Sequence, residues 1–110
     1  MNETERPAMI RMRIHSRGIE LLVAACDADL LGRTLREGEL RLYVSSFYDG
    51  EDVTEEEFIR QLKLATIGNL VGKETVEAAR RAGLVGNDGV LMIEGVPHAQ
   101  LFVMNVAEDA

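Results

Sequence analysis

Three residues whose side chains can do chemistry stand at separate points of this 110-residue chain: Cys26, Asn69 and His98. A cysteine acts as a nucleophile only as its thiolate, which needs a nearby base such as histidine, and an asparagine can orient that base. Asp27 adds a carboxylate, so Cys26, Asp27 and His98 are the candidate catalytic residues. No diagnostic local motif surrounds them, and the favoured interpretation of Cys26 is a buried, inert thiol.

Asn69 and His98 are also the centre of the expected binding cluster. His98 follows Pro97 in a tight loop, and Asn69 opens the segment Asn-Leu-Val-Gly that ends at Gly72. We expect this segment to join two helices, where asparagine and glycine tolerate unusual backbone geometry. The amides at the start of the following helix could bind a phosphate or carboxylate. Asn69, Gly72 and His98 are therefore predicted binding residues, although each also has an adequate structural role.

Arginines on predicted strands suggest a second kind of contact. Arg11, Arg13, His15 and Arg41 share the polar faces of strands that could be neighbours. Tyr43, with Tyr48 as a second candidate, offers a ring on which bases stack. This is the strongest nucleic-acid feature of the sequence. Arginines on the solvated face of a sheet are also commonly hydrated or paired with acids, so that reading stays open.

The charge distribution limits the partners. The net charge of −7 opposes non-specific attraction to nucleic acid and to anionic membranes. Residues 1–41 hold seven arginines and seven acidic residues, whereas residues 42–110 hold five basic and twelve acidic ones. An anion-binding face is therefore expected in the first third, while a basic protein partner fits the acidic remainder.

The single cysteine and two histidines exclude several site types. One cysteine cannot form an internal disulfide or a zinc site of paired thiolates, and two histidines cannot build a histidine-rich metal site. We expect neither a metal nor a cofactor. The longest apolar run, residues 21–26, is too short to cross a bilayer, and the N-terminus lacks the apolar core of a secretory signal. The expected location is the cytoplasm.

The elements that would position these residues follow from hydrophobic periodicity. Ile10, Met12 and Ile14 alternate with polar residues, and the continuous apolar run after Ile19 is typical of a more central strand, so the two should form a hairpin. Thr54 to Glu57 fits a capping box that begins a helix. The predicted strands are residues 10–15, 19–26, 38–45, 90–93 and 101–106, and the predicted helices begin near residues 54 and 73.

This order of elements indicates an α+β fold, with a mainly antiparallel sheet and a helix pair packed on one face. The length suits one domain over residues 1–110. Residues 1–8 and 107–110 look like tails. The strand order and the oligomeric state remain open, and pairing between sheet edges of several copies is one possibility.

Several segments, in this order and spacing, resemble a small archaeal family known as domain of unknown function 424. They are Cys26-Asp27 with Leu30-Leu31-Gly32, Glu37-Gly38, Phe47-Tyr48, Asn69-Leu70-Val71-Gly72, Ala82-Gly83-Leu84 and Gly95-Val96-Pro97-His98-Ala99. The resemblance covers residues 9–102. It implies a small cytosolic protein without an established activity, and a loose association with genes of translation and ribosome biogenesis.

Two functions remain as hypotheses. The first is a non-enzymatic accessory binding protein in translation or another RNA-linked process, which contacts RNA or a ribosomal or translation protein. The second is a small enzyme or ligand-binding domain that uses a pocket of His98, Asn69 and Cys26. The second requires these side chains to converge in space.

Overall fold

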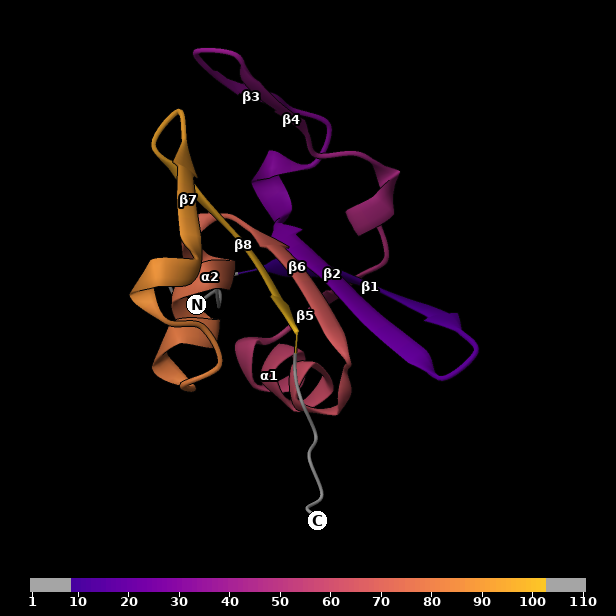
Figure 1. Ribbon diagram of the computed structural model, residues 1–110. Helices are drawn as coiled ribbons and strands as arrows, with labels where there is room; N and C mark the ends of the chain where they lie inside the picture. The colour runs from indigo at the N-terminus through magenta and orange to yellow at the C-terminus, as the bar shows by residue number, and fades with distance from the viewer. Residues whose placement is uncertain (1–8, 103–110) are drawn as a thin grey trace, which may run out of the picture.

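The structure of the protein is a computed structural model and describes residues 9–102. Within them, eight strands and two α-helices form a mixed α+β fold (Figure 1). Six strands form one sheet, antiparallel except where β2 runs parallel to β6. In spatial order they are β5 (Glu51–Val53), β1 (Ile10–Arg17), β2 (Glu20–Asp27), β6 (Ile67–Val71), β8 (Val96–Phe102) and β7 (Val90–Ile93).

The predicted N-terminal hairpin is confirmed. β1 and β2 pair antiparallel from Ile10 opposite Asp27 to Arg17 opposite Glu20. β2 is the more central strand, because β6 pairs with its other edge. Its second half is buried, as the apolar run of the sequence predicts.

The helices are separated by a strand, which corrects the expected helix connection. α1 (Glu55–Leu64) begins as predicted, because Thr54 Oγ1 accepts a hydrogen bond from the Glu57 amide at 3.1 Å. α2 (Lys73–Arg81) follows only after β6, so the prediction that Asn69 lies in a helix connection is wrong. Gly68 allows β6 to pack closely against the side chains of Leu101 and Leu62, because a Cβ at this position would lie 2.8 Å from Leu101 Cδ2 and 3.0 Å from Leu62 Cδ1.

A small hairpin replaces the single strand predicted over residues 38–45. β3 (Thr34–Glu37) and β4 (Leu40–Tyr43) form a separate two-stranded sheet, which projects beyond the large one in Figure 1. Gly38 lies in the turn with a positive φ of 61° rather than at the start of a strand. The short helices η2 (Ala28–Leu30) and η3 (Ser46–Tyr48) flank this hairpin, and together the three form an excursion of the chain between β2 and β5.

The C-terminal hairpin also differs from the prediction. The turn between β7 and β8 consists of Glu94 and Gly95, which both have positive φ. β8 therefore begins at Val96, and the expected loop over residues 95–98 is wrong. The predicted strand beyond residue 102 lies outside the described residues, as do the predicted tails.

Alternate residues of β2 enter two clusters of buried side chains, because successive residues of a strand point to opposite faces. In the first cluster, Val23 and Ala25 pack with side chains from both helices, including Phe58, Leu62, Val76 and Ala79. In the second, Ala24 and Cys26 pack under the excursion between β2 and β5, with Leu30, Leu35, Val44 and Tyr48. Over residues 9–102, no helix is long and apolar enough to span a membrane.

Candidate functional site

Asn69 and His98 meet on the face of the sheet that η3 covers. In the β6–β8 ladder, Asn69 stands opposite Gln100 and Val71 opposite His98, which places the two side chains diagonally on one face. The His98 Nε2 atom lies 3.3 Å from Asn69 Oδ1. The convergence that a shared site requires is therefore present, although strands rather than a helix connection and a loop provide it.

Tyr48, which the sequence offered only as a second ring for base stacking, completes this group. Its hydroxyl donates to Asn69 Oδ1 at 2.6 Å, and its side chain is only 3% exposed. We call Tyr48, Asn69 and His98 the clamp, because they fasten η3 to the sheet. Ser45 Oγ accepts a hydrogen bond from the Phe47 amide and so caps the start of η3. A serine directly before this short aromatic segment is the signal in the sequence that could have indicated the helix that carries Tyr48.

Burial sets the protonation of the clamp. Burial lowers the pKa of His98, and burial together with the nearby Cys26 raises the pKa of Tyr48 to about 12. Both groups are therefore neutral at physiological pH. Asn69 Oδ1 already accepts from Tyr48, so a bond between this oxygen and His98 requires the imidazole to donate from Nε2. His98 Nδ1 then remains as an acceptor.

The thiol of Cys26 is buried beneath this face. Its residue is 0% exposed, and burial, together with the charge of Asp27, raises its pKa to about 12. A nucleophilic cysteine needs a lowered pKa and some exposure. The position of Cys26 therefore argues against a nucleophilic role, while its contacts with other buried side chains give it a packing role.

Asp27 points to the opposite face and caps α2, not the short helix that directly follows it. Its carboxylate accepts from the amides of Glu74 and Thr75 at 3.1 and 2.9 Å, and from Thr75 Oγ1 at 2.8 Å. Gly72 allows this approach, because a Cβ there would lie 2.3 Å from Asp27 Cγ. The amides that could have bound a phosphate are thus occupied by a carboxylate of the chain itself.

The three predicted RNA-contacting arginines lie in different surroundings. Arg11 forms ion pairs with Asp49 and Asp52, each at 2.9 Å, and these bonds raise its pKa. Arg13 donates to the Ser46 carbonyl at 3.2 Å and is exposed. Arg41 lies on the separate β3–β4 sheet, so the large sheet does not unite all three.

A second group of residues forms a cavity of about 580 Å³ between the β1–β2 hairpin and η3, and we call it the stack pocket. The ring of His15 stacks on Phe47, with centroids 4.5 Å apart and an interplanar angle of 16°. His15 Nε2 lies 2.9 Å from the Phe47 carbonyl, which fixes the ring further. The other lining residues include Arg13, Arg17, Glu20, Leu22 and Ile67.

The two arginines of the stack pocket are open to a ligand. Within residues 9–102, no carboxylate lies at ion-pair distance from Arg13 or Arg17. Arg17 stands opposite Glu20 in the hairpin, and the Glu20 carboxylate accepts from Thr66 Oγ1 at 3.0 Å. Sequence periodicity placed Arg13 and His15 on one face, but it missed Arg17 and Phe47, because Phe47 arrives from a short helix far along the chain.

The described residues hold no group of three or more His, Cys, Asp and Glu side chains that could bind a metal ion. The clamp offers hydrogen bonds between neutral groups, and the stack pocket offers cationic and aromatic side chains.

Comparisons with known proteins agree with the resemblance of the sequence. The fold is similar to the crystal structure of an uncharacterized conserved protein from Methanopyrus kandleri, with a TM-score of 0.79 and 26% sequence identity. This likeness covers 94% of the present chain and 98% of the other. No curated protein matches the chain. The family described as Protein of unknown function (DUF424) matches residues 14–104, and the chain belongs to this family.

Proposed function

We propose that the protein is a non-enzymatic binding protein for single-stranded RNA, which it holds in the stack pocket. The observation that carries this proposal is the stacked pair of His15 and Phe47 in a cavity that Arg13 and Arg17 also line. Proteins bind single strands by stacking bases on aromatic rings while cationic side chains track the phosphates. The cavity volume of about 580 Å³ is sufficient for a base and its sugar.

The local charge supports binding of an anion despite the net charge of −7. Arg13, His15 and Arg17 face a single carboxylate in the stack pocket, that of Glu20. Most acidic residues lie in the second part of the chain, and Asp49 and Asp52 are held by Arg11. A ligand that approaches β1 from the side of η3 therefore meets a basic region of an acidic protein.

The clamp has a positioning role in this proposal. Tyr48 and Phe47 are consecutive residues of η3, so the bond from Tyr48 to Asn69 fixes the helix that carries the stacking ring. His98 supports the same oxygen of Asn69. The predicted centre at Asn69 and His98 thus acts on the ligand through Phe47 and not by direct contact.

The direct test is fluorescence anisotropy with a fluorescein-labelled single-stranded RNA of mixed sequence and about twelve nucleotides. Neutralising both arginines, Arg13→Gln with Arg17→Gln, should weaken binding and lower the slope of log affinity against log salt by about 1.4. The matched control is Arg60→Gln with Lys63→Gln, which removes two exposed charges from α1 and should bind like the unchanged protein.

Two outcomes would contradict the proposal. The unchanged protein could fail to bind the RNA at low salt, or the α1 control could lose as much affinity as the Arg13 and Arg17 variant.

The setting that we propose for this contact is an accessory role in translation or another RNA-linked process of the cytoplasm. Crosslinking in native cells tests that setting, which is abandoned if neither RNA nor a ribosomal or translation protein is recovered.

A further inference from the structure

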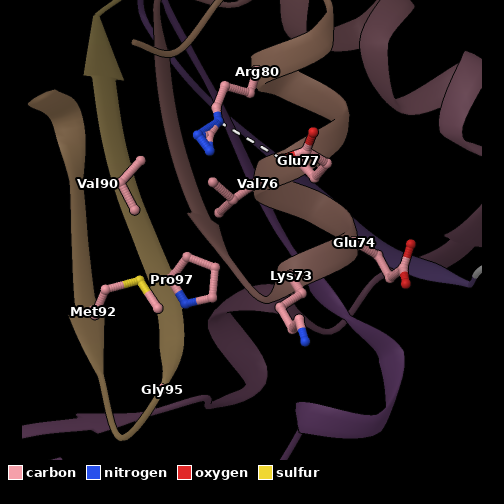
Figure 2. Close-up of a pocket in the computed structure, with 9 residues that line it drawn as sticks. All are labelled: Lys73, Glu74, Val76, Glu77, Arg80, Val90, Met92, Gly95 and Pro97. Carbon is pink, nitrogen blue, oxygen red and sulfur yellow. Dashed lines mark ion pairs between the residues drawn. The ribbon is translucent and has the colours of Figure 1, made fainter. Parts of the chain in front are cut away.

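A groove of about 520 Å³ runs between α2 and the last hairpin (Figure 2). Val76 of the groove packs on the helix side of the sheet, whereas Leu22 and Phe47 of the stack pocket pack on the other side. The lining of the groove includes Lys73, Val76 and Arg80 from α2, and Val90, Met92 and Pro97 from the strands. The groove is thus bounded on one side by a helix and on the other by β7, which is the edge strand of the six-stranded sheet. A helix beside an open strand is the setting in which proteins add an extended peptide to a sheet.

The backbone of β7 has hydrogen-bonding groups on its open side. Met92 stands opposite Pro97, which has no N–H and whose carbonyl accepts from the Gly72 amide at 2.9 Å. This pair therefore exchanges no bonds, and the N–H and carbonyl of Met92 point away from β8. Val90, two residues earlier, points the same way. Of the described strands, only β8 pairs with β7, so these groups are open to another strand.

The side chains beside this edge favour an apolar residue with an acidic neighbour. The Met92 side chain is 49% exposed and lines the groove with Val76, Val90 and Pro97. Within residues 9–102, Lys73 has no ion pair, and Figure 2 shows it beside Pro97.

The acidic side chains that line the groove are not paired with Lys73. Glu77 pairs with Arg80 at 3.7 Å and with Arg81 at 3.9 Å. The Glu74 carboxylate points away from the strands in Figure 2. Lys73 is therefore available to a carboxylate that enters beside Gly95.

The geometry points to a peptide-binding groove, in which an extended segment of a partner protein adds to β7 as a seventh strand. An apolar side chain of the partner lies against Val76 and Met92, and an acidic side chain meets Lys73. Backbone groups at Val90 and Met92 supply affinity, and the groove supplies specificity. A second copy of this chain is disfavoured as the occupant, because it carries the same net charge of −7.

The test uses the full chain and a displayed library of random peptides of about ten residues. We expect enrichment of peptides in which apolar residues alternate and an acidic residue lies near one end. A synthetic enriched peptide should protect the Met92 and Val90 amides of the unchanged protein from hydrogen exchange. The absence of enrichment, or protection elsewhere with no change at Met92, would overturn the inference.

Variants then separate the backbone contact from the side-chain contact. Met92→Pro removes the outward N–H, which an edge strand tolerates, and should weaken the enriched peptide about tenfold. Met92→Val keeps the N–H and is the matched control, while Leu91→Ala alters a side chain of similar exposure on the other face. Lys73→Gln should weaken acidic peptides only. Equal loss with Met92→Val and Met92→Pro would contradict strand addition. A dimer in light scattering that Met92→Pro converts to monomer would overturn the proposed occupant, because a second copy would then fill the edge of β7.

Discussion

Phe47 and Tyr48 are neighbours in one short helix, yet they belong to two regions that differ in whether their polar side chains already have a partner within the protein. Tyr48 enters the clamp, where its buried hydroxyl and the imidazole of His98 both hydrogen-bond the part-buried Asn69 Oδ1. Phe47 borders the stack pocket, where Arg13 and Arg17 lack a carboxylate partner among the described residues.

The contrast teaches how structural and ligand-binding polar residues differ on one face of a sheet. A satisfied, buried polar group stabilises a unique arrangement, and removing one partner leaves the other with an uncompensated desolvation cost. A cation held near an aromatic ring without a counter-charge keeps its capacity for a ligand. Changes in the clamp should therefore affect the free energy of unfolding, whereas changes in the stack pocket should affect RNA affinity.

The largest expected effect comes from truncating the two neighbouring aromatic residues one at a time. Tyr48→Ala should lower the free energy of unfolding by about 3–5 kcal/mol, because it empties a buried site. Phe47→Ala should cost about 1–2 kcal/mol, since the Phe47 ring is only half-buried. Urea unfolding followed by circular dichroism measures both. Equal losses would remove the distinction between the two regions.

The hydrogen bond inside the clamp should show coupling between its partners. Asn69→Leu should cost about 1–3 kcal/mol, because the buried Tyr48 hydroxyl loses its acceptor. The double variant with Tyr48→Phe should cost less than the sum of the two single variants, since no hydroxyl is then left unpaired. Strict additivity in urea unfolding would show that the bond contributes nothing to the clamp.

The sequence predicted that Asn69 and His98 form one cluster, but it placed them in a helix connection and a loop instead of the strands β6 and β8. The stripe of Phe58, Leu62 and Ala65 has helical spacing, and Gly68 is a local sign only that the helix weakens, not that a strand begins. What decides that segment is its pairing with β2, more than forty residues earlier. Local periodicity cannot report such a pairing, because its stabilising contacts are distant in sequence.

The hairpin of β1 and β2 and the start of α1 were predictable because their signals are local. Alternation, an apolar run and the cap at Thr54 each act within a few residues. The contacts of Tyr48 with Asn69 and of Phe47 with His15 were not predictable, because these partners lie 21 and 32 residues away. The candidate site is thus built mainly from contacts that only the folded chain creates.

RNA affinity should fall when the stack pocket loses its aromatic ring but keeps its charges. Phe47→Leu should weaken the single-stranded RNA by about 1–2 kcal/mol while leaving the salt slope unchanged, because stacking is lost and phosphate contacts remain. His98→Gln keeps a donor that can reach Asn69, so Phe47 should stay in place and RNA affinity should remain within about 0.5 kcal/mol of that of the unchanged protein. Anisotropy titrations at several salt concentrations measure both. A larger effect of His98→Gln would move the RNA contact into the clamp.

The smallest expected effect is the pH dependence that His98 gives to the clamp. Burial lowers its pKa in the folded protein, so the unfolded chain binds the proton more readily. The resulting stability is present above the ordinary histidine pKa and is lost as the pH falls from there through the lowered pKa of the folded state. His98→Gln should therefore unfold with a smaller difference in stability between about pH 7.5 and about pH 5 than the unchanged protein. An identical pH dependence would show that proton binding at His98 is not linked to folding, and would leave Tyr48 and Asn69 as the energetic centre of the clamp.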